Sequence, residues 1–216
     1  MDKGQVLRHL GCRDWHQAQA ISREMDRLVD RMIDECEELM TPRYVWEITG
    51  LTFAGQHVEA GGLALPGKDI EAHLQGARSA ALLAVTLGGE VDRAIRRYEV
   101  RDMTRAVILD AAAGQAVEEA CDLVQAEIGK MADRNGLWTG ARFSPGYGDF
   151  PLEIQPDFLR WLDAARKIGL ACTPTLILTP RKSVTAVIGL FPQPVERCGE
   201  NCMYCNQSQD CPYRRS

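Results

Sequence analysis

The stretch RFSPGYGD, which begins at Arg142, gathers residue types that can hold a small charged ligand. Arg142 offers a fixed cation whose fork of N–H donors matches a carboxylate. Ser144 and Pro145 shape a turn, and Gly146 lets a ligand approach the backbone because it has no Cβ. Tyr147 adds a flat face for stacking and a hydroxyl for hydrogen bonding. The set fits a ligand with a carboxylate at one end and a cationic or aromatic group further along. A tight Pro-Gly turn with an exposed arginine is the alternative.

Four cysteines crowd the end of the chain with the spacing C-x3-C-x2-C-x5-C, namely Cys198, Cys202, Cys205 and Cys211. Thiolates at such short intervals can surround one metal centre, either tetrahedral zinc or an iron–sulfur cluster. Pro212 follows the fourth cysteine as in bacterial ferredoxins, and only one C-x2-C pair is present, where zinc sites more often show two. We therefore predict an iron–sulfur cluster, with zinc as the alternative. A flexible tail of free thiols is the remaining interpretation.

Composition limits the classes of function. The formal net charge of −5 over 216 residues argues against the basic surface that nucleic-acid phosphates require. The start of the chain lacks the apolar run of a signal peptide, and no stretch approaches about eighteen uncharged apolar residues. We therefore expect a cytoplasmic protein without nucleic-acid or membrane partners. The histidines share no ligand spacing, and no nucleophile motif, phosphate loop or dinucleotide fingerprint occurs, so no catalytic acid–base residue is predicted.

Hydrophobic periodicity predicts the elements that must position these residues. Helices are expected over residues 15–40, 68–77 (opened by an Asp69 cap), about 90–99, about 102–133 and 156–170. Strands are expected over 43–49, at one or two places in the glycine-rich stretch 50–68, and over 80–89. A hairpin with a Pro-Arg-Lys turn is expected within 173–190. On the long helix, Asp110 falls on the apolar stripe, which would place a carboxylate on a buried face.

Strands and helices do not alternate strictly, which favours an α+β fold over a doubly wound sheet. We expect a mixed or antiparallel sheet with packed helices. Three parts are predicted: an N-terminal helical segment (1–40), an α+β domain (41–192) and the cysteine-rich tail (193–216).

The stretch RFSPGYGDFPLEIQ from Arg142, with LTPRKSVTAVIGL from Leu178 downstream, resembles the activation domain of cobalamin-dependent methionine synthase. It is more closely similar to the stand-alone bacterial versions of that domain. The resemblance runs from about residue 40 to residue 191. It implies an R-x-x-P-G-Y loop that binds S-adenosylmethionine, and a role in returning an inactive cob(II) corrinoid to its methylated state. The corrinoid would come on a partner protein, because the chain lacks the D-x-H-x-x-G sequence of cobalamin-binding domains.

The resemblance also implies roles for single residues. Arg142 would contact the methionyl carboxylate, while Ser144, Gly146 and Tyr147, with Pro145 between them, would surround the ligand. The family uses a glutamate on the long helix before the loop, and Glu118 stands at the matching position, with Glu119 the competing choice. A carboxylate there would pair with the ligand's ammonium or sulfonium group. The acidic residue that the family carries shortly before the loop is missing here, so the resemblance implies no contact residue at the adenosine end of the ligand.

Together these features predict an activation component of a methyltransferase in methionine biosynthesis. It would reactivate a corrinoid methyltransferase in trans with S-adenosylmethionine, and its cluster would pass on an electron, with a further electron donor possible. The alternatives are a non-catalytic accessory subunit, or an iron–sulfur electron carrier of a corrinoid methyltransferase system.

Overall fold

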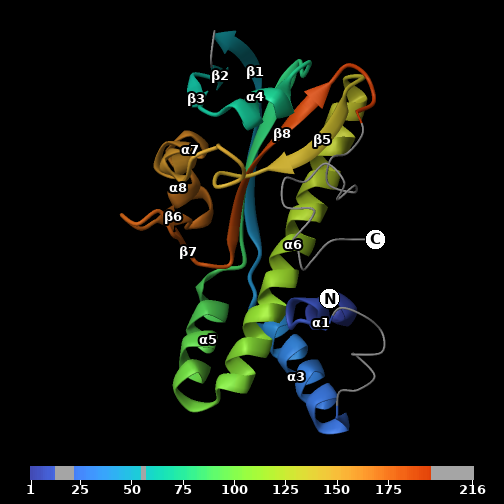
Figure 1. The fold of residues 1–216 in the computed structure, drawn as a ribbon, viewed down its shortest axis with the longest axis vertical. Helices are drawn as coiled ribbons and strands as arrows, with labels where there is room; N and C mark the ends of the chain where they lie inside the picture. The colour runs from blue at the N-terminus through green and yellow to red at the C-terminus, as the bar shows by residue number, and fades with distance from the viewer. Residues whose placement is uncertain (13–21, 55–56, 196–216) are drawn as a thin grey trace.

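The computed structural model describes residues 1–12, 22–54 and 57–195 (Figure 1). Its helices are α1 (Lys3–His9), α3 (Arg23–Leu39), α4 (Lys68–Leu74), α5 (Gly89–Arg101), α6 (Met103–Arg134), α7 (Gln155–Leu162) and α8 (Ala164–Ile168), with a 3-10 turn at Leu152–Ile154. Its strands are β1 (Arg43–Ala54), β2 (His57–Ala60), β3 (Leu63–Leu65), β4 (Ser79–Thr86), β5 (Trp138–Phe143), β6 (Ala171–Cys172), β7 (Leu178–Thr179) and β8 (Ser183–Phe191). None of the helices in these ranges is long and apolar enough to cross a membrane.

An antiparallel sheet of six strands, in the order β3-β2-β1-β4-β8-β5, forms the centre of the fold. The central strand β4 is buried on both faces, which explains its continuous apolar run. Ala80, Leu82 and Ala84 point to one face, and the residues between them point to the other. Together with the helices, this sheet confirms the predicted α+β class.

Helices cover both faces of the sheet. On one face, α6 packs through Cys121, Val124 and Ile128 against the inner residues of β4 and β8. On the other face, α4, α7 and α8 enclose a second core that is filled by buried side chains such as Phe150 and Phe158. Figure 1 shows α6 running along the sheet, with α7 and α8 on the opposite side.

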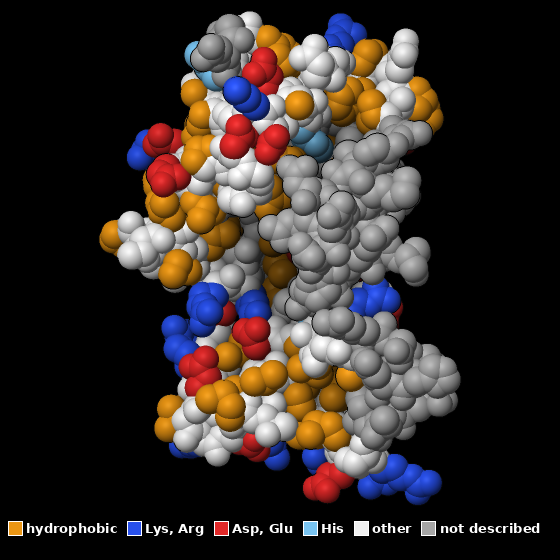
Figure 2. Space-filling model, viewed as in Figure 1, with side chains coloured by type: hydrophobic (Ala, Val, Ile, Leu, Met, Phe, Trp, Pro, Cys, Tyr) orange, Lys and Arg blue, Asp and Glu red, His pale blue; other side chains and the backbone are white. Residues whose placement is uncertain are grey.

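A third core lies beyond the end of the sheet, where α1, α3 and α5 pack around the first half of α6. We call this part the helical lobe; it lies at the bottom of Figure 1. Lys3 of α1 forms ion pairs with Asp26 and Asp30 of α3, at 2.7 and 2.6 Å. On the face drawn in Figure 2, acidic and basic side chains lie next to one another, and hydrophobic side chains reach the surface of the lobe. Val100, Met103 and Val107 are among the exposed apolar residues.

Four local predictions were wrong, each for a physical reason. The helix expected over 156–170 divides into α7 and α8, because Asp163 adopts a left-handed conformation with φ 54°. The expected hairpin does not form, because β7 pairs with β6 while β8 pairs with β4 and β5. Asp69 is not the cap of α4; Gly67 holds that position. Asp110 is exposed, and its carboxylate pairs with Lys182 at 2.8 Å.

Candidate functional site

Arg142 lies near the end of β5, an edge strand that pairs only with β8 in the sheet. The register between these strands shifts between Thr139 and Arg142, as at a β-bulge. A β-bulge bends the strand locally and so changes the direction in which the following side chains point. Here the guanidinium reaches the neighbouring helix α6.

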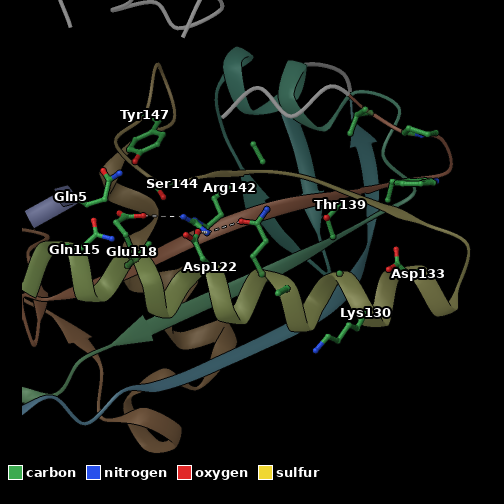
Figure 3. A pocket seen from close by; sticks show the side chains of 18 of the residues that line it. Gln5, Gln115, Glu118, Asp122, Lys130, Asp133, Thr139, Arg142, Ser144 and Tyr147 are labelled. Carbon is green, nitrogen blue, oxygen red and sulfur yellow. Dashed lines mark hydrogen bonds and ion pairs between the residues drawn. The ribbon is translucent and has the colours of Figure 1, made fainter. Parts of the chain in front are cut away.

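Three side chains of α6 hold the guanidinium of Arg142 (Figure 3). Its Nη1 donates to Asp122 Oδ1 at 2.7 Å and to Gln125 Oε1 at 2.8 Å, and its Nη2 donates to Glu118 Oε2 at 3.1 Å. Residues 118, 122 and 125 share one face of the helix because they are spaced by four and three positions. We call these four residues the arginine cluster.

The arginine cluster still has capacity to bind a ligand. An arginine side chain carries five N–H donors, and the three hydrogen bonds above occupy three of them. The Nε–H and one Nη2–H have no acceptor among the described residues. Burial opposes the charge of Arg142, but the hydrogen bond to Asp122 and the nearby negative charges raise its pKa above the ordinary value. The guanidinium is therefore a permanent cation, flanked by two carboxylates that can attract a positive group.

The loop after β5 is a compact turn. The N–H of Gly146 donates to the carbonyl of Phe150 at 2.7 Å, and the N–H of Tyr147 donates to the carbonyl of Ser144 at 3.0 Å. Gly146 has φ 93°, a conformation that favours glycine whether or not a ligand is present. Pro145 and Phe150 are buried and anchor the turn.

Two aspartates fasten this loop to the start of α4. The Asp149 carboxylate accepts hydrogen bonds from the backbone N–H groups of Lys68 and Asp69, at 2.8 and 2.9 Å. In return, the Asp69 carboxylate accepts from the N–H of Asp149 at 3.1 Å. We call this pair the aspartate clamp. The hydrogen bonds from Asp69 and Lys68 lower the pKa of Asp149. Gly148 has φ 54°, and a Cβ there would collide with the Asp69 carboxylate.

Tyr147 presents an aromatic ring at the surface. Its side chain is about half exposed, and its ring meets Phe143 edge-on with centroids 5.9 Å apart. Desolvation, followed by the negative charge of Glu118, raises the pKa of Tyr147. The phenol is therefore neutral and can donate a hydrogen bond at neutral pH.

A groove of about 1150 Å³ runs along α6, between α1 and β5. Arg142, Ser144, Tyr147 and Glu118 line it, while Pro145 and Gly146 do not. Trp138 lines it too, at the start of β5. In Figure 3 the arginine cluster lies in the middle of the groove, with Tyr147 toward one end and Lys130 toward the other.

The structure distinguishes the two candidate glutamates. Glu118 meets Arg142, whereas Glu119 accepts hydrogen bonds from Gln115 and from the backbone of Asp2. Asp122 and Gln125 were not identified from the sequence. Their spacing of four and seven residues from Glu118 places all three on one face of a helix, which could have indicated them. The four predicted tail cysteines lie outside the described residues. Within the described ranges, no group of three or more His, Cys, Asp or Glu side chains is arranged to hold a metal ion.

Structural comparison identifies a solved protein with the same arrangement of elements. The MetH reactivation domain bound to AdoHcy has a similar fold. The TM-score is 0.63 at 16% sequence identity, and the match covers 85% of this chain and 69% of that chain. No protein-family model matches the sequence, and no curated protein does either. The likeness establishes the fold, and so supports the resemblance that the sequence carries.

Proposed function

We propose that this protein binds S-adenosylmethionine in the groove along α6 and uses it in the reductive reactivation of a corrinoid methyltransferase that is supplied by another chain. The observation that carries the proposal is the arginine cluster beside the loop from Ser144 to Tyr147. It occurs on the fold of a domain that has been solved with AdoHcy, the demethylated form of the same ligand.

The charges of the groove complement this ligand. The free N–H donors of Arg142 suit the methionyl carboxylate, because charge-assisted pairs of this kind are the strong ones. Glu118 and Asp122 place negative charge where the ligand's ammonium and sulfonium groups need it. Tyr147 supplies an aromatic wall and a hydroxyl donor. A ligand with two positive centres and one carboxylate therefore matches one arginine flanked by two acids.

The proposed role of the protein in the reaction is positioning. An electron converts the inactive cob(II) corrinoid of the partner to a strong nucleophile, which takes the sulfonium methyl group as the S–CH3 bond breaks. S-adenosylhomocysteine is then the product. Such a transfer needs orientation rather than acid–base catalysis. A groove that is open along α6 can hold the ligand while its methyl group faces a docked partner.

The tail cysteines are proposed to bind the metal centre that delivers this electron. The support is their spacing, which suits an iron–sulfur cluster. The proposal for the groove does not depend on it.

Calorimetric titration with S-adenosylmethionine tests the central proposal. We expect the wild-type protein to bind, and Arg142→Ala to weaken binding by roughly ten- to a hundredfold, the loss expected for a charge-assisted hydrogen bond. Arg160→Ala is the matched control, because Arg160 is exposed, pairs with Asp157 on its own helix and does not line the groove. If wild-type protein fails to bind at millimolar ligand, the proposal is wrong.

A further inference from the structure

One end of the groove gathers two carboxamides beside an aromatic ring. Gln5, Gln115 and Tyr147 all line the groove. In Figure 3 Gln5 and Gln115 lie on the far side of Glu118 from Asp122, and Tyr147 lies above Glu118. None of the three takes part in holding Arg142.

The two carboxamides are held in place by different elements. Gln5 belongs to α1, which is fixed because the adjacent Val6 and Leu7 are buried in the helical lobe. Its carboxamide makes no hydrogen bond to another described side chain. Gln115 belongs to α6, and its Nε2 donates to Glu119 at 3.0 Å. That bond leaves the Oε1 of Gln115 as an acceptor facing the groove.

This combination suits an adenine base. A carboxamide oxygen accepts from the exocyclic amino group of adenine, and a carboxamide N–H donates to a ring nitrogen. An aromatic face adds stacking, which is favourable for any base. Gln115 supplies the acceptor, Gln5 can supply the donor, and Tyr147 supplies the ring. Contact with Phe143 limits the orientations that this ring can take.

The spacing along α6 also fits. Gln115 and Asp122 are seven residues apart, which is about 10 Å along a helix axis. A carboxylate held at Arg142 and a base held beside Gln115 would therefore place the sulfonium near Glu118. The Glu118 carboxylate would then lie close to the positively charged sulfonium of the ligand.

We propose that Gln5, Gln115 and Tyr147 form the adenine-binding end of the groove, so that α1 completes the ligand site. This inference rests on the proposed function. The opposite end, at Lys130, Asp133 and Trp138, offers two opposite charges and an indole. Among the described residues at this end, only Thr139, through its single hydroxyl, offers a neutral side chain that can both donate and accept along the edge of a base.

Photolabelling locates the base directly. The wild-type protein is irradiated with S-adenosylmethionine that carries an azide on its adenine ring, with and without excess unmodified ligand, and the labelled peptides are mapped. We expect label on α1 or on the loop around Tyr147. Titration with S-adenosylmethionine should show affinity falling roughly three- to tenfold for Gln5→Ala and for Gln115→Ala. Gln75→Ala, at an exposed position after α4, should bind like the wild type.

The outcomes separate the two proposals. If the ligand binds, Arg142→Ala weakens it, and the label maps to residues 130–139, the proposed function stands and the adenine assignment is overturned. Unchanged affinity in both glutamine variants overturns it as well. If unmodified ligand neither binds nor competes with the label, the proposed function itself fails.

Discussion

Arg142 combines observed structural contacts with a proposed role in ligand binding. Its guanidinium is mostly shielded from solvent, and three side chains of α6 offset the cost of that burial. The same contacts fix the direction of its remaining donors, so a ligand carboxylate would meet an arginine that is already oriented. Preorganisation of this kind lowers the entropic cost of binding.

Glu118→Gln tests the electrostatic part of the site. The substitution keeps the shape of the side chain but removes its charge, so S-adenosylmethionine, with its sulfonium, should bind roughly three- to tenfold more weakly. S-adenosylhomocysteine lacks that charge and should lose less. Calorimetry with both ligands measures the difference, with Glu127→Gln as the control, because Glu127 is an exposed carboxylate of α6 that does not line the groove. Equal losses for the two ligands would instead assign Glu118 to the ammonium group.

Two buried thiols should be chemically inert. Burial raises the pKa of Cys36 and of Cys121 to about 12, so both remain protonated at pH 8, and both are fully buried. Iodoacetamide at pH 8 followed by peptide mapping should modify the half-buried Cys12 and Cys172 well before either of them. Unfolding should abolish the difference. Rapid modification of Cys121 in native protein would contradict this account.

The same two thiols should make stability depend on pH. Because burial raises the folded-state pKa of Cys36 and Cys121, the free energy of unfolding should fall as the pH rises above their unfolded pKa near 9.

At the scale of elements, the aspartate clamp connects the loop that carries Tyr147 to α4. The two segments are about eighty residues apart in the chain, and the hydrogen bonds of Asp149 to Lys68 and Asp69 bring them together. A carboxylate at a helix N-terminus also interacts favourably with the helix dipole. The loop that carries Tyr147 therefore depends on an element that does not itself line the groove.

Asp149→Ala should loosen this loop without unfolding the protein. We expect faster amide hydrogen exchange between residues 144 and 150, and weaker S-adenosylmethionine binding by several-fold. Asp157→Ala, which removes an exposed pair within α7, is the control.

The aspartate clamp should also depend on pH. Because the folded-state pKa of Asp149 is lowered, the clamp is fully formed above the ordinary aspartate pKa. It is lost as the pH falls through the lowered value. Exchange that is unchanged in the variant and in acid would argue against the clamp.

The elements also show how far sequence reasoning reaches. The helices over Arg23–Leu39 and Met103–Arg134 follow from periodicity, and β4 follows from its apolar run. The sequence predicts no strand over β5, because that segment is short, polar and partly exposed. The break at Asp163 depends on tertiary packing, since a left-handed aspartate leaves no compositional mark. Arg142, Tyr147 and Glu118 all line the groove, while their binding of a ligand stays a prediction. That α1 lines the same groove follows only from its packing on α6, which the sequence pattern does not predict.

At the scale of the whole molecule, α6 links the parts that the site needs. This 32-residue helix contributes to the helical lobe with its first half and to the sheet core with its second half. Residues from α1, α6 and the end of β5 therefore meet in one groove. The predicted division at residues 40 and 192 stays a prediction, although the packing of α1 and α3 on α6 shows that residues before 40 contribute to the same core as α6.

The cysteine tail carries the last prediction. Protein purified without oxygen should be coloured, and should contain iron and acid-labile sulfide, because four closely spaced thiolates suit a cluster. Replacing Cys198, Cys202, Cys205 and Cys211 together by serine should abolish the visible absorption and the iron. Binding of S-adenosylmethionine should remain, since Arg142 and the groove draw on other residues. Reductive methylation of a partner's corrinoid should then require an added chemical reductant. A colourless protein with one bound zinc would exclude electron delivery by the tail, while the proposed methyl-donor site along α6 would still be tested by its own titration.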